Sequence, residues 1–269
     1  MNKLKNIKLY LLDMDGTIYL GDELFDGTAE FLDYVEKSGG RYIFLTNNSS
    51  KSVNEYILKL GKMGIRTGRE DFLTSADATA EYLREQSFKK IYVLGTRAFA
   101  DWLRECGLNV TDGISDGIDC LCMGYDTELT YKKLEDACKL LGGDIAYIAT
   151  NPDWVCPTSY GYAPDCGSVS EMLYRATGKR PKFIGKPEPA MVRLAMKMTR
   201  FDKSETVVVG DRLYTDIACG VNAGINTIFL LSGEGTADDI DKYNITPDYT
   251  FANIKELYYN LKLGDGKND

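Results

Sequence analysis

The chain has 269 residues, of which 44% are hydrophobic and 27% charged, and its 40 acidic residues outnumber 32 Lys and Arg for a net charge of −8. This length suits one large or two modest domains. No basic excess exists to release counterions, so we expect no nucleic-acid polymer as partner. No apolar run reaches the length of a membrane span, so we expect no membrane partner either.

The absence of histidine narrows the possible chemistry. It excludes Ser-His-Asp and Cys-His catalysis and any zinc site that uses imidazole. Seven cysteines, without C-x-x-C spacing, favour a reducing compartment, and residues 1–8 lack the apolar segment of a secretory signal. We therefore predict a cytoplasmic protein whose chemistry uses carboxylate, lysine, hydroxyl and metal.

The first part of the chain alternates strand-like and helical patterns. Residues 7–12 form an apolar run that predicts a buried strand. A helix near residues 28–37, a strand at 41–46 and a helix that stops at Gly64 follow. Such alternation is typical of an α/β fold with a mainly parallel sheet.

A second series of elements occupies the middle of the chain. Short strands are predicted at residues 90–94, 119–123 and 145–150, with helices near 97–105 and 131–141 between them. This series has about one hundred residues, which is near the size of a small domain.

The last part resumes the first pattern, with strands near residues 181–184, 206–209 and 225–231 and a helix near 188–198. The simplest layout is a doubly wound core domain built from both ends of the chain, with a second α/β domain inserted into it. The predicted boundaries are 1–78 and 181–269 for the core and 79–180 for the insert.

Two aspartates, Asp13 and Asp15, follow the first predicted strand in the sequence D-M-D-G-T. Carboxylates at i and i+2 leave a strand on one side, so they can share a divalent cation and still do different chemistry. An ordinary acidic turn after a strand is the alternative for these residues alone.

Polar residues also follow three other predicted strands: Thr46 with Asn47, Lys186, and Asp211 with Asp216. The carboxyl ends of a doubly wound sheet open into one crevice, where such residues can meet. Each group has an ordinary alternative as a turn, a helix cap or a solvated lysine. All four groups agree in their order along the chain, in their position at strand ends and in their ability to bind a metal or a phosphate. This agreement favours a shared site.

These residue types fit attack on a phosphate monoester. The phosphate dianion repels a carboxylate nucleophile, so a cation must lie between them, and Mg²⁺ prefers hard oxygen ligands. Asp13 and Asp211 can supply carboxylate oxygens and Asp15 its main-chain carbonyl. Asp216 would orient metal-bound water from outside the ligand set.

A two-step reaction follows from these residues. In-line attack by Asp13 gives an aspartyl-phosphate, and Asp15 donates a proton to the leaving alkoxide and then activates water. The Thr46 hydroxyl and the Asn47 amide bind phosphoryl oxygens, and Lys186 neutralises charge.

The chain resembles the phosphatases of the haloacid dehalogenase superfamily. It matches their four motifs in order: D-x-D-G-T at 13–17, the strand-end Thr46, Lys186, and G-D-x-x-x-x-D at 210–216. It more closely resembles subfamily IIA, the 4-nitrophenyl phosphatase or NagD-like branch, at residues 12–19, 45–50, 149–153, 184–187 and 210–216. The resemblance implies a Rossmann-like core, Mg²⁺ dependence, and a large α/β cap domain inserted between the second and third motifs.

In relatives, a cap loop sets the preference for the leaving group. The corresponding stretch is residues 151–168, with Asn151, Asp153, Asp165, Cys166 and Gly167 as candidate specificity residues. The stretch is polar and has no Lys or Arg, so it lacks a clamp for a second phosphate. We predict a preference for neutral or sugar-like leaving groups over bisphosphates; a simple connector is the alternative.

The resulting hypothesis is a Mg²⁺-dependent phosphatase of small phosphomonoesters, such as sugar phosphates, nucleoside monophosphates and nitrophenyl phosphate. The expected partner is a small phosphorylated metabolite, and exposed cap surfaces leave room for a homodimer. Two alternatives stay open: a phosphosugar mutase that uses the same intermediate, and a phosphate-binding regulatory protein without turnover. Asp15 argues against a long-lived phospho-accepting module, which needs no acid two residues after the nucleophile.

Overall fold

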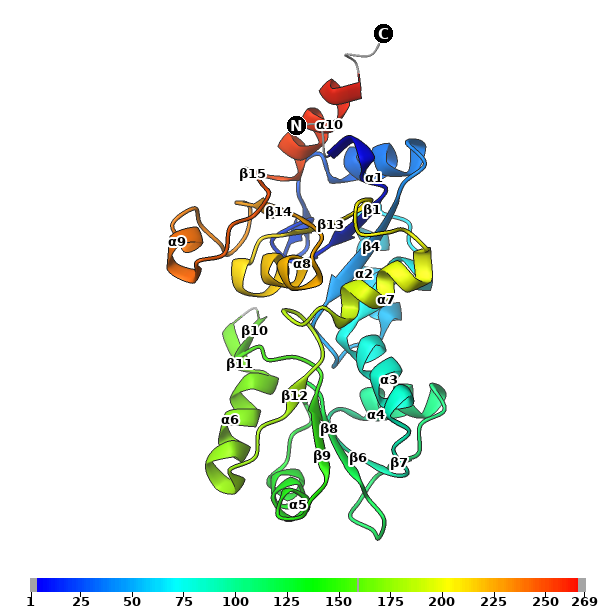
Figure 1. The fold of residues 1–269 in the computed structure, drawn as a ribbon, viewed down its shortest axis with the longest axis vertical. Coiled ribbons are helices and arrows are strands. Elements are labelled where there is room, and N and C mark those ends of the chain that lie inside the picture. Colours follow the sequence, from blue (N-terminus) through cyan, green and yellow to red (C-terminus); the bar gives the residue numbers. More distant parts are fainter. Residues whose placement is uncertain (1–3, 159, 266–269) are drawn as a thin grey trace. The chain divides into compact units, whose positions relative to one another are not determined.

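The computed structural model describes residues 4–158 and 160–265, which divide into two compact units. The first unit contains the described residues up to Thr46, then Val53–Leu73, then those from Lys186 onward. The second contains Asn47–Ser52 and Thr74–Gly185. Figure 1 shows the first and the last described elements, η1 (Leu4–Asn6) and α10 (Ile254–Asp265), in the first unit. At the main borders these divisions differ from the predicted boundaries by about five residues, and the second unit also includes Asn47–Ser52, which the prediction places in the core. The naming of the units as core and cap stays a prediction.

The first unit is built on a six-stranded sheet in the order β15-β14-β13-β1-β4-β5. The pairings of β1 with β4 and β13, of β13 with β14, and of β14 with β15 are parallel. The strands are β1 (Leu9–Leu12), β4 (Arg41–Thr46), β5 (Phe72–Thr74), β13 (Thr206–Gly210), β14 (Asn226–Leu230) and β15 (Tyr249–Phe251). Every residue of β1 and β13 is buried, as expected for central strands covered on both faces.

Helices and a hairpin complete the first unit. The α-helices are α1 (Thr28–Lys37), α2 (Val53–Lys62), α7 (Ala190–Thr199), α8 (Ala218–Ala223), α9 (Asp239–Tyr243) and α10 (Ile254–Asp265). The other elements are the 3-10 helices η1 (Leu4–Asn6) and η2 (Arg69–Asp71), the π-helix η3 (Leu213–Ile217), and the hairpin of β2 (Tyr19–Leu20) and β3 (Glu23–Leu24). The core contains fully buried aromatics. The Phe44 and Phe72 rings lie 5.3 Å apart, and Tyr10 meets Phe31 edge-on at the same distance.

The second unit has its own parallel five-stranded sheet, in the order β12-β9-β8-β6-β7. Its strands are β6 (Ile91–Leu94), β7 (Val110–Thr111), β8 (Cys120–Met123), β9 (Ala146–Ala149) and β12 (Lys182–Phe183). Helices α3 (Ser75–Gln86) and α4 (Arg97–Glu105) lie on one face and α5 (Tyr131–Leu141) and α6 (Cys166–Thr177) on the other (Figure 1). This unit is therefore also doubly wound.

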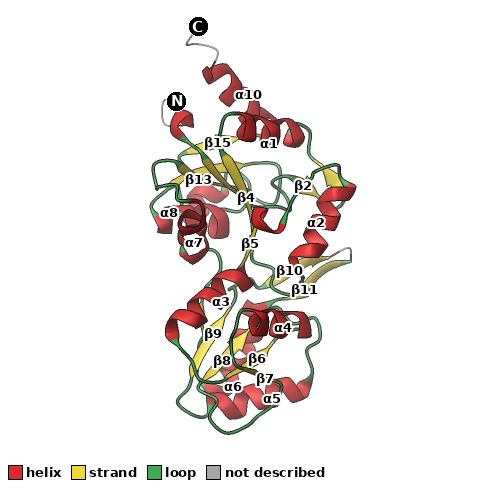
Figure 2. Cartoon of the chain, turned by 90° about the vertical axis from the view of Figure 1, so that its right-hand side faces the viewer, coloured by secondary structure: helices red, strands yellow, loops and turns green. Residues whose placement is uncertain are grey.

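The predicted fold class, α/β with parallel sheets and a Rossmann-like core, is confirmed. The helices predicted at 97–105 and 131–141 have those bounds in the structure. The predicted loop 151–168 is wrong in part, because it contains an antiparallel hairpin of β10 (Val155–Thr158) and β11 (Gly161–Pro164), labelled in Figure 2. Among the described residues, no helix combines the length and apolar character needed to cross a membrane.

Candidate active site

Asp13 lies at the carboxyl edge of the first unit's sheet. It directly follows β1, and its backbone N–H donates to the Val209 carbonyl of β13 at 2.9 Å. This bond extends the parallel pairing by one residue and fixes where the side chain leaves the sheet. The turn that follows requires Gly16, whose φ of +85° lies in the left-handed region.

Asp211 follows the neighbouring strand β13 and is held on both carboxylate oxygens. The Thr17 hydroxyl donates to Oδ1 at 3.1 Å, and the Glu234 backbone N–H donates to Oδ2 at 2.8 Å. The side chain is almost fully buried. The first and last motifs of the sequence are thus joined by a direct hydrogen bond.

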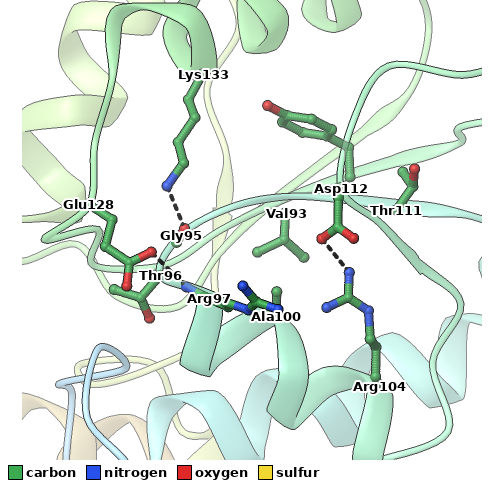
Figure 3. A pocket seen from close by; sticks show the side chains of 11 residues that line it. Val93, Gly95, Thr96, Arg97, Ala100, Arg104, Thr111, Asp112, Glu128 and Lys133 are labelled. Carbon is green, nitrogen blue, oxygen red and sulfur yellow. Dashed lines mark hydrogen bonds and ion pairs between the residues drawn. The ribbon is translucent and has the colours of Figure 1, made fainter.

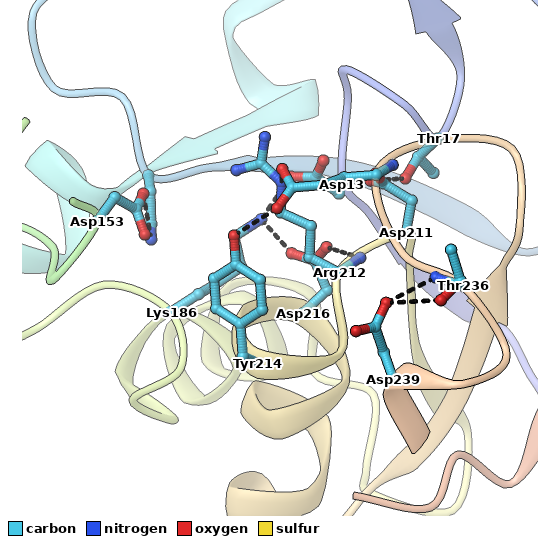
Figure 4. Close-up of polar contacts among 12 residues, drawn as sticks. Asp13, Thr17, Asp153, Lys186, Asp211, Arg212, Tyr214, Asp216, Thr236 and Asp239 are labelled. Atoms are coloured by element: carbon cyan, nitrogen blue, oxygen red, sulfur yellow. Dashed lines mark hydrogen bonds and ion pairs between the residues drawn. The ribbon is translucent and has the colours of Figure 1, made fainter. Parts of the chain in front are cut away.

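Lys186 connects two of the predicted acidic residues. Its Nζ donates to Oδ1 of Asp13 at 2.5 Å and to Oδ1 of Asp216 at 2.6 Å (Figure 4). It also donates to the Leu45 carbonyl of β4 at 3.3 Å. The lysine is 3% exposed, so its charge is compensated by these partners and not by water.

Three carboxylates gather around this lysine. Oxygens of Asp13, Asp211 and Asp216 lie within 4.8 Å of one another, which is close enough to share one ion. Hard carboxylate oxygens in this number suit Mg²⁺ or a similar divalent cation. The cluster suits a metal, because Lys186 contacts only two of the three carboxylates and the nearby Arg212 is paired with Glu234.

The pKa values of Asp13 and Asp211 reflect their burial and the nearby negative charge of Asp216. Burial, with the Asp216 charge, raises the pKa of Asp13 to about 7, although Lys186 opposes the shift. Burial and Asp216 likewise raise the pKa of Asp211 to about 6. Burial disfavours the charge on Lys186, but Asp13 and Asp216 raise its pKa well above the usual value. A cation bound among the carboxylates would favour their ionised forms.

Three other predicted residues have contacts or positions of their own. Asp15 is exposed, and its backbone forms an isolated bridge with Tyr19. Thr46 ends β4 and is half-buried. Asn47 belongs to the second unit, where its side-chain amide donates to Asp153 Oδ2 at 3.1 Å. The structure thus brings Asp13, Lys186, Asp211 and Asp216 into one cluster and pairs Asn47 with a predicted cap residue.

The remaining candidate residues of the second unit have structural contacts. Asn151 donates to the Asn47 carbonyl at 2.9 Å, and Asp165 caps helix α6 by accepting from the Cys166 N–H. Burial raises the pKa of Asp165 to about 7. Cys166 is buried, and a Cβ on Gly167 would lie 2.3 Å from the Pro152 carbonyl oxygen, so only glycine fits there.

Sequence reasoning missed three residues of this site. Thr17 and Arg212 lie inside the two aspartate motifs, but no role is predicted for them from the sequence. Thr17 comes two residues after Asp15, and Arg212 directly follows Asp211. Glu234 forms an ion pair with Arg212 at 2.9 Å and holds Asp211 through its backbone. No sequence pattern marks Glu234, because it enters the site from the loop after β14.

Comparisons with known proteins agree with this geometry. A model described as haloacid dehalogenase-like hydrolase matches residues 10–109, and a related HAD-hydrolase-like model matches residues 183–257. An acid sugar phosphatase of Staphylococcus aureus is 36% identical over 260 residues, which cover 96% of this chain and all of that protein.

Two solved structures are similar over nearly the whole chain. The 4-nitrophenylphosphatase of Thermotoga maritima has a TM-score of 0.91 and 37% identity, covering 96% of this chain and 99% of that one. The glycerol phosphate phosphatase of Mycobacterium tuberculosis, solved in complex with magnesium, has a TM-score of 0.89 and 30% identity, covering 97% and 79%.

The chain therefore belongs to the haloacid dehalogenase-like hydrolases, a class of enzymes with this doubly wound core. The predicted resemblance to the 4-nitrophenyl phosphatase or NagD-like branch is confirmed, and the protein is a phosphatase of that branch. Members of this class use a divalent metal, which agrees with the carboxylate cluster.

Replacing Gly16 should disable the site. In Gly16→Ala a Cβ would lie 2.4 Å from Asp211 Oδ2, so the carboxylate must move, and a displacement of about 1 Å costs roughly 10²-fold in rate. Gly21→Ala is the matched control, because Gly21 also has positive φ but no atom within 4 Å of the new Cβ. Rates of chromogenic phosphomonoester hydrolysis should fall in the first variant only; equal rates would show that Asp211 is not displaced.

The metal-free protein should lose stability as pH rises. The folded protein holds on Asp13 a proton that the unfolded chain releases near the ordinary pKa of 3.8, and the folded pKa is about 7. The folded state therefore binds more protons across this window, and the free energy of unfolding falls between about pH 4 and pH 7. Urea unfolding in EDTA measures this trend, which should be weaker in Asp13→Asn. A trend of the same size in that variant would assign it to other groups.

Proposed function

We propose that the protein hydrolyses small phosphomonoesters through an aspartyl-phosphate on Asp13, with Mg²⁺ as the metal. The observation that carries this proposal is the buried contact of Lys186 with both Asp13 and Asp216, beside Asp211. A nucleophilic carboxylate, a fixed positive charge and a set of metal ligands are the parts that phosphoryl transfer needs.

Mg²⁺ would be held by carboxylate oxygens of Asp13 and Asp211 and by the Asp15 carbonyl, with Asp216 orienting metal-bound water. Its charge reduces the repulsion between the carboxylate and the phosphate dianion. The raised pKa values of Asp13 and Asp211 support this assignment, because both groups gain from a nearby cation.

The chemistry then uses the residues around the phosphate. An oxygen of Asp13 forms a bond to phosphorus while the bond from phosphorus to the leaving oxygen breaks, and Asp15 gives that oxygen a proton. Ionised Asp15 next takes a proton from water, which attacks the aspartyl-phosphate and releases inorganic phosphate. The exposed position of Asp15, two residues after Asp13, supports this role.

The charge on the phosphoryl group is neutralised by Lys186, which is held in place by its contacts with Asp13, Asp216 and the Leu45 carbonyl. The Thr46 hydroxyl and the Asn47 amide are the proposed donors to the other phosphoryl oxygens.

Sugar phosphates are the proposed substrate class, with nucleoside monophosphates and nitrophenyl phosphate as further substrates. The names of the Staphylococcus aureus and Mycobacterium tuberculosis relatives, acid sugar phosphatase and glycerol phosphate phosphatase, support neutral polyol leaving groups. Residues 151–168 contain no Lys or Arg, which supports the same preference. The proposal also includes selection of the leaving group by Asp153 and its neighbours. It further includes a homodimer formed through the cap and a cytoplasmic location.

Phosphate release should require both the metal and Asp13. Asp13→Asn should lower kcat by at least about a thousandfold, because the amide cannot attack phosphorus. Asp33→Asn, an exposed aspartate on α1, is the control and should keep full activity. Release of phosphate from esters is measured with Mg²⁺ and with EDTA. Isomerised sugar phosphate instead of free phosphate would indicate a mutase, and tight phosphate binding without turnover a regulatory protein.

Asp15→Asn should slow the enzyme according to the leaving group. Loss of the general acid costs roughly 10²–10⁴-fold in rate. The loss should be larger for a sugar phosphate, whose alkoxide needs a proton, than for nitrophenyl phosphate, whose phenolate leaves without one. Steady-state kcat on the two substrates gives the ratio. An equal loss on both would restrict Asp15 to activation of water.

A substrate panel should rank sugar monophosphates above bisphosphates. A second phosphate carries about two negative charges and meets no Lys or Arg in residues 151–168. Comparing kcat/KM for a sugar monophosphate and its bisphosphate, at equal free Mg²⁺, tests this preference. If the bisphosphate is the better substrate, another cationic segment must recognise it.

A further inference from the structure

The second unit contains a cavity of about 310 Å³ that the phosphatase chemistry does not use. It lies at the carboxyl ends of β6, β7 and β8 and is lined by Gly95 and Thr96 after β6, the first turn of α4, and Glu128 and Lys133 from the segment after β8 (Figure 3). All of its lining residues belong to this one unit.

The position of the cavity is the one at which open α/β sheets bind ligands. In the order β7-β6-β8-β9-β12, the chain passes from β6 to β7 on one side and then to β8 on the other. The strand order therefore reverses between β6 and β8, and the loops after these two strands diverge there. Its volume is at the lower end of the range for small-molecule pockets, roughly 300–1,000 Å³.

Three basic side chains line the cavity, and two of them already form hydrogen bonds or ion pairs with other residues of the chain. Lys133 donates to the Gly95 carbonyl at 2.9 Å and to Asp126, while Arg104 pairs with Asp101 and Asp112. The Arg97 guanidinium is 86% exposed, and its Nε lies 3.8 Å from Asp101, beyond hydrogen-bond distance. Arg97 is thus the most available positive charge at the rim.

The carboxylate of Glu128 already lies at a position where an anion can bind to the backbone of α4. Glu128 Oε2 accepts from the backbone N–H of Arg97 at 3.0 Å, in the first turn of α4. Glu128 is exposed on the segment between β8 and α5, so its replacement by another oxyanion disturbs no packing. Thr96 caps the same helix through the Phe99 N–H and keeps this first turn in place.

We propose that this cavity binds a small organic or inorganic oxyanion, a carboxylate or a phosphate, at a second ligand site that is lined by residues of the second unit alone. The oxyanion replaces Glu128 at the Arg97 N–H and pairs with the Arg97 guanidinium. The rest of the ligand enters the cavity between the loops after β6 and β8. The site is therefore independent of whether Asp13 is the nucleophile.

Residue-resolved NMR of the full-length protein tests this site. Succinate and inorganic phosphate are titrated separately into the ¹⁵N-labelled protein in EDTA, and the backbone amides of Gly95, Thr96 and Arg97 are followed. At least one probe should shift them saturably. Saturation with succinate alone identifies a carboxylate ligand, and with phosphate alone a phosphorylated one.

Variants separate this site from general charge effects. Arg97→Gln should weaken binding several-fold, and Glu128→Gln should strengthen it several-fold, because a competing negative charge is removed. Arg175→Gln is the matched control, since Arg175 is also exposed in an i,i+4 pair of the same unit but lies outside the cavity. The proposal is overturned if neither probe saturates, or if Arg97→Gln and Arg175→Gln change the affinity equally.

Discussion

The active centre depends on one buried interaction, the ammonium group of Lys186 between the carboxylates of Asp13 and Asp216. Burying charges costs free energy unless they are paired, and here one positive group serves a cluster of three acids with Asp211. Burial, together with the Asp216 charge, raises the pKa of Asp13 to about 7 although Lys186 opposes the shift. The cluster is therefore set to gain a cation and, with it, an ionised Asp13.

The parallel sheet makes this cluster possible. Strands β1 and β13 are neighbours, and each ends in one of the acids, so residues nearly two hundred positions apart meet at one edge. Backbone contacts then fix the side chains, through the Asp13 N–H on Val209 and the Glu234 N–H on Asp211. Positioning by main-chain bonds limits how far the carboxylates can relax when their charge changes.

Much of this arrangement could be predicted from sequence. Alternating strand and helix patterns gave the α/β class, because strand length and apolar content are local properties. The positions of Asp13 and Asp211 after core strands followed from the same patterns, but the strand predicted before Lys186 lies in the sheet of the second unit as β12. The identity of a phosphatase came from the resemblance of whole motifs and not from periodicity.

Other features depend on tertiary contacts and escaped prediction. Residues 155–158 and 161–164 pair as a hairpin although they carry Pro157, Pro164 and Gly161, which local patterns predict as loop. Asn47 pairs with Asp153, more than one hundred residues away, and no local signal indicates that contact. The cavity beside Arg97 is visible only once the strand order β7-β6-β8 is known.

The proposed mechanism depends on a phosphoryl group carried by Asp13 during turnover. Its most direct test is acid quenching within milliseconds of mixing enzyme, Mg²⁺ and substrate, followed by borohydride reduction and peptide mass spectrometry. Borohydride should reduce Asp13 to homoserine, which occurs only if its carboxylate was phosphorylated, and should leave Asp15 unchanged. An unmodified Asp13 together with a full burst of product would contradict it.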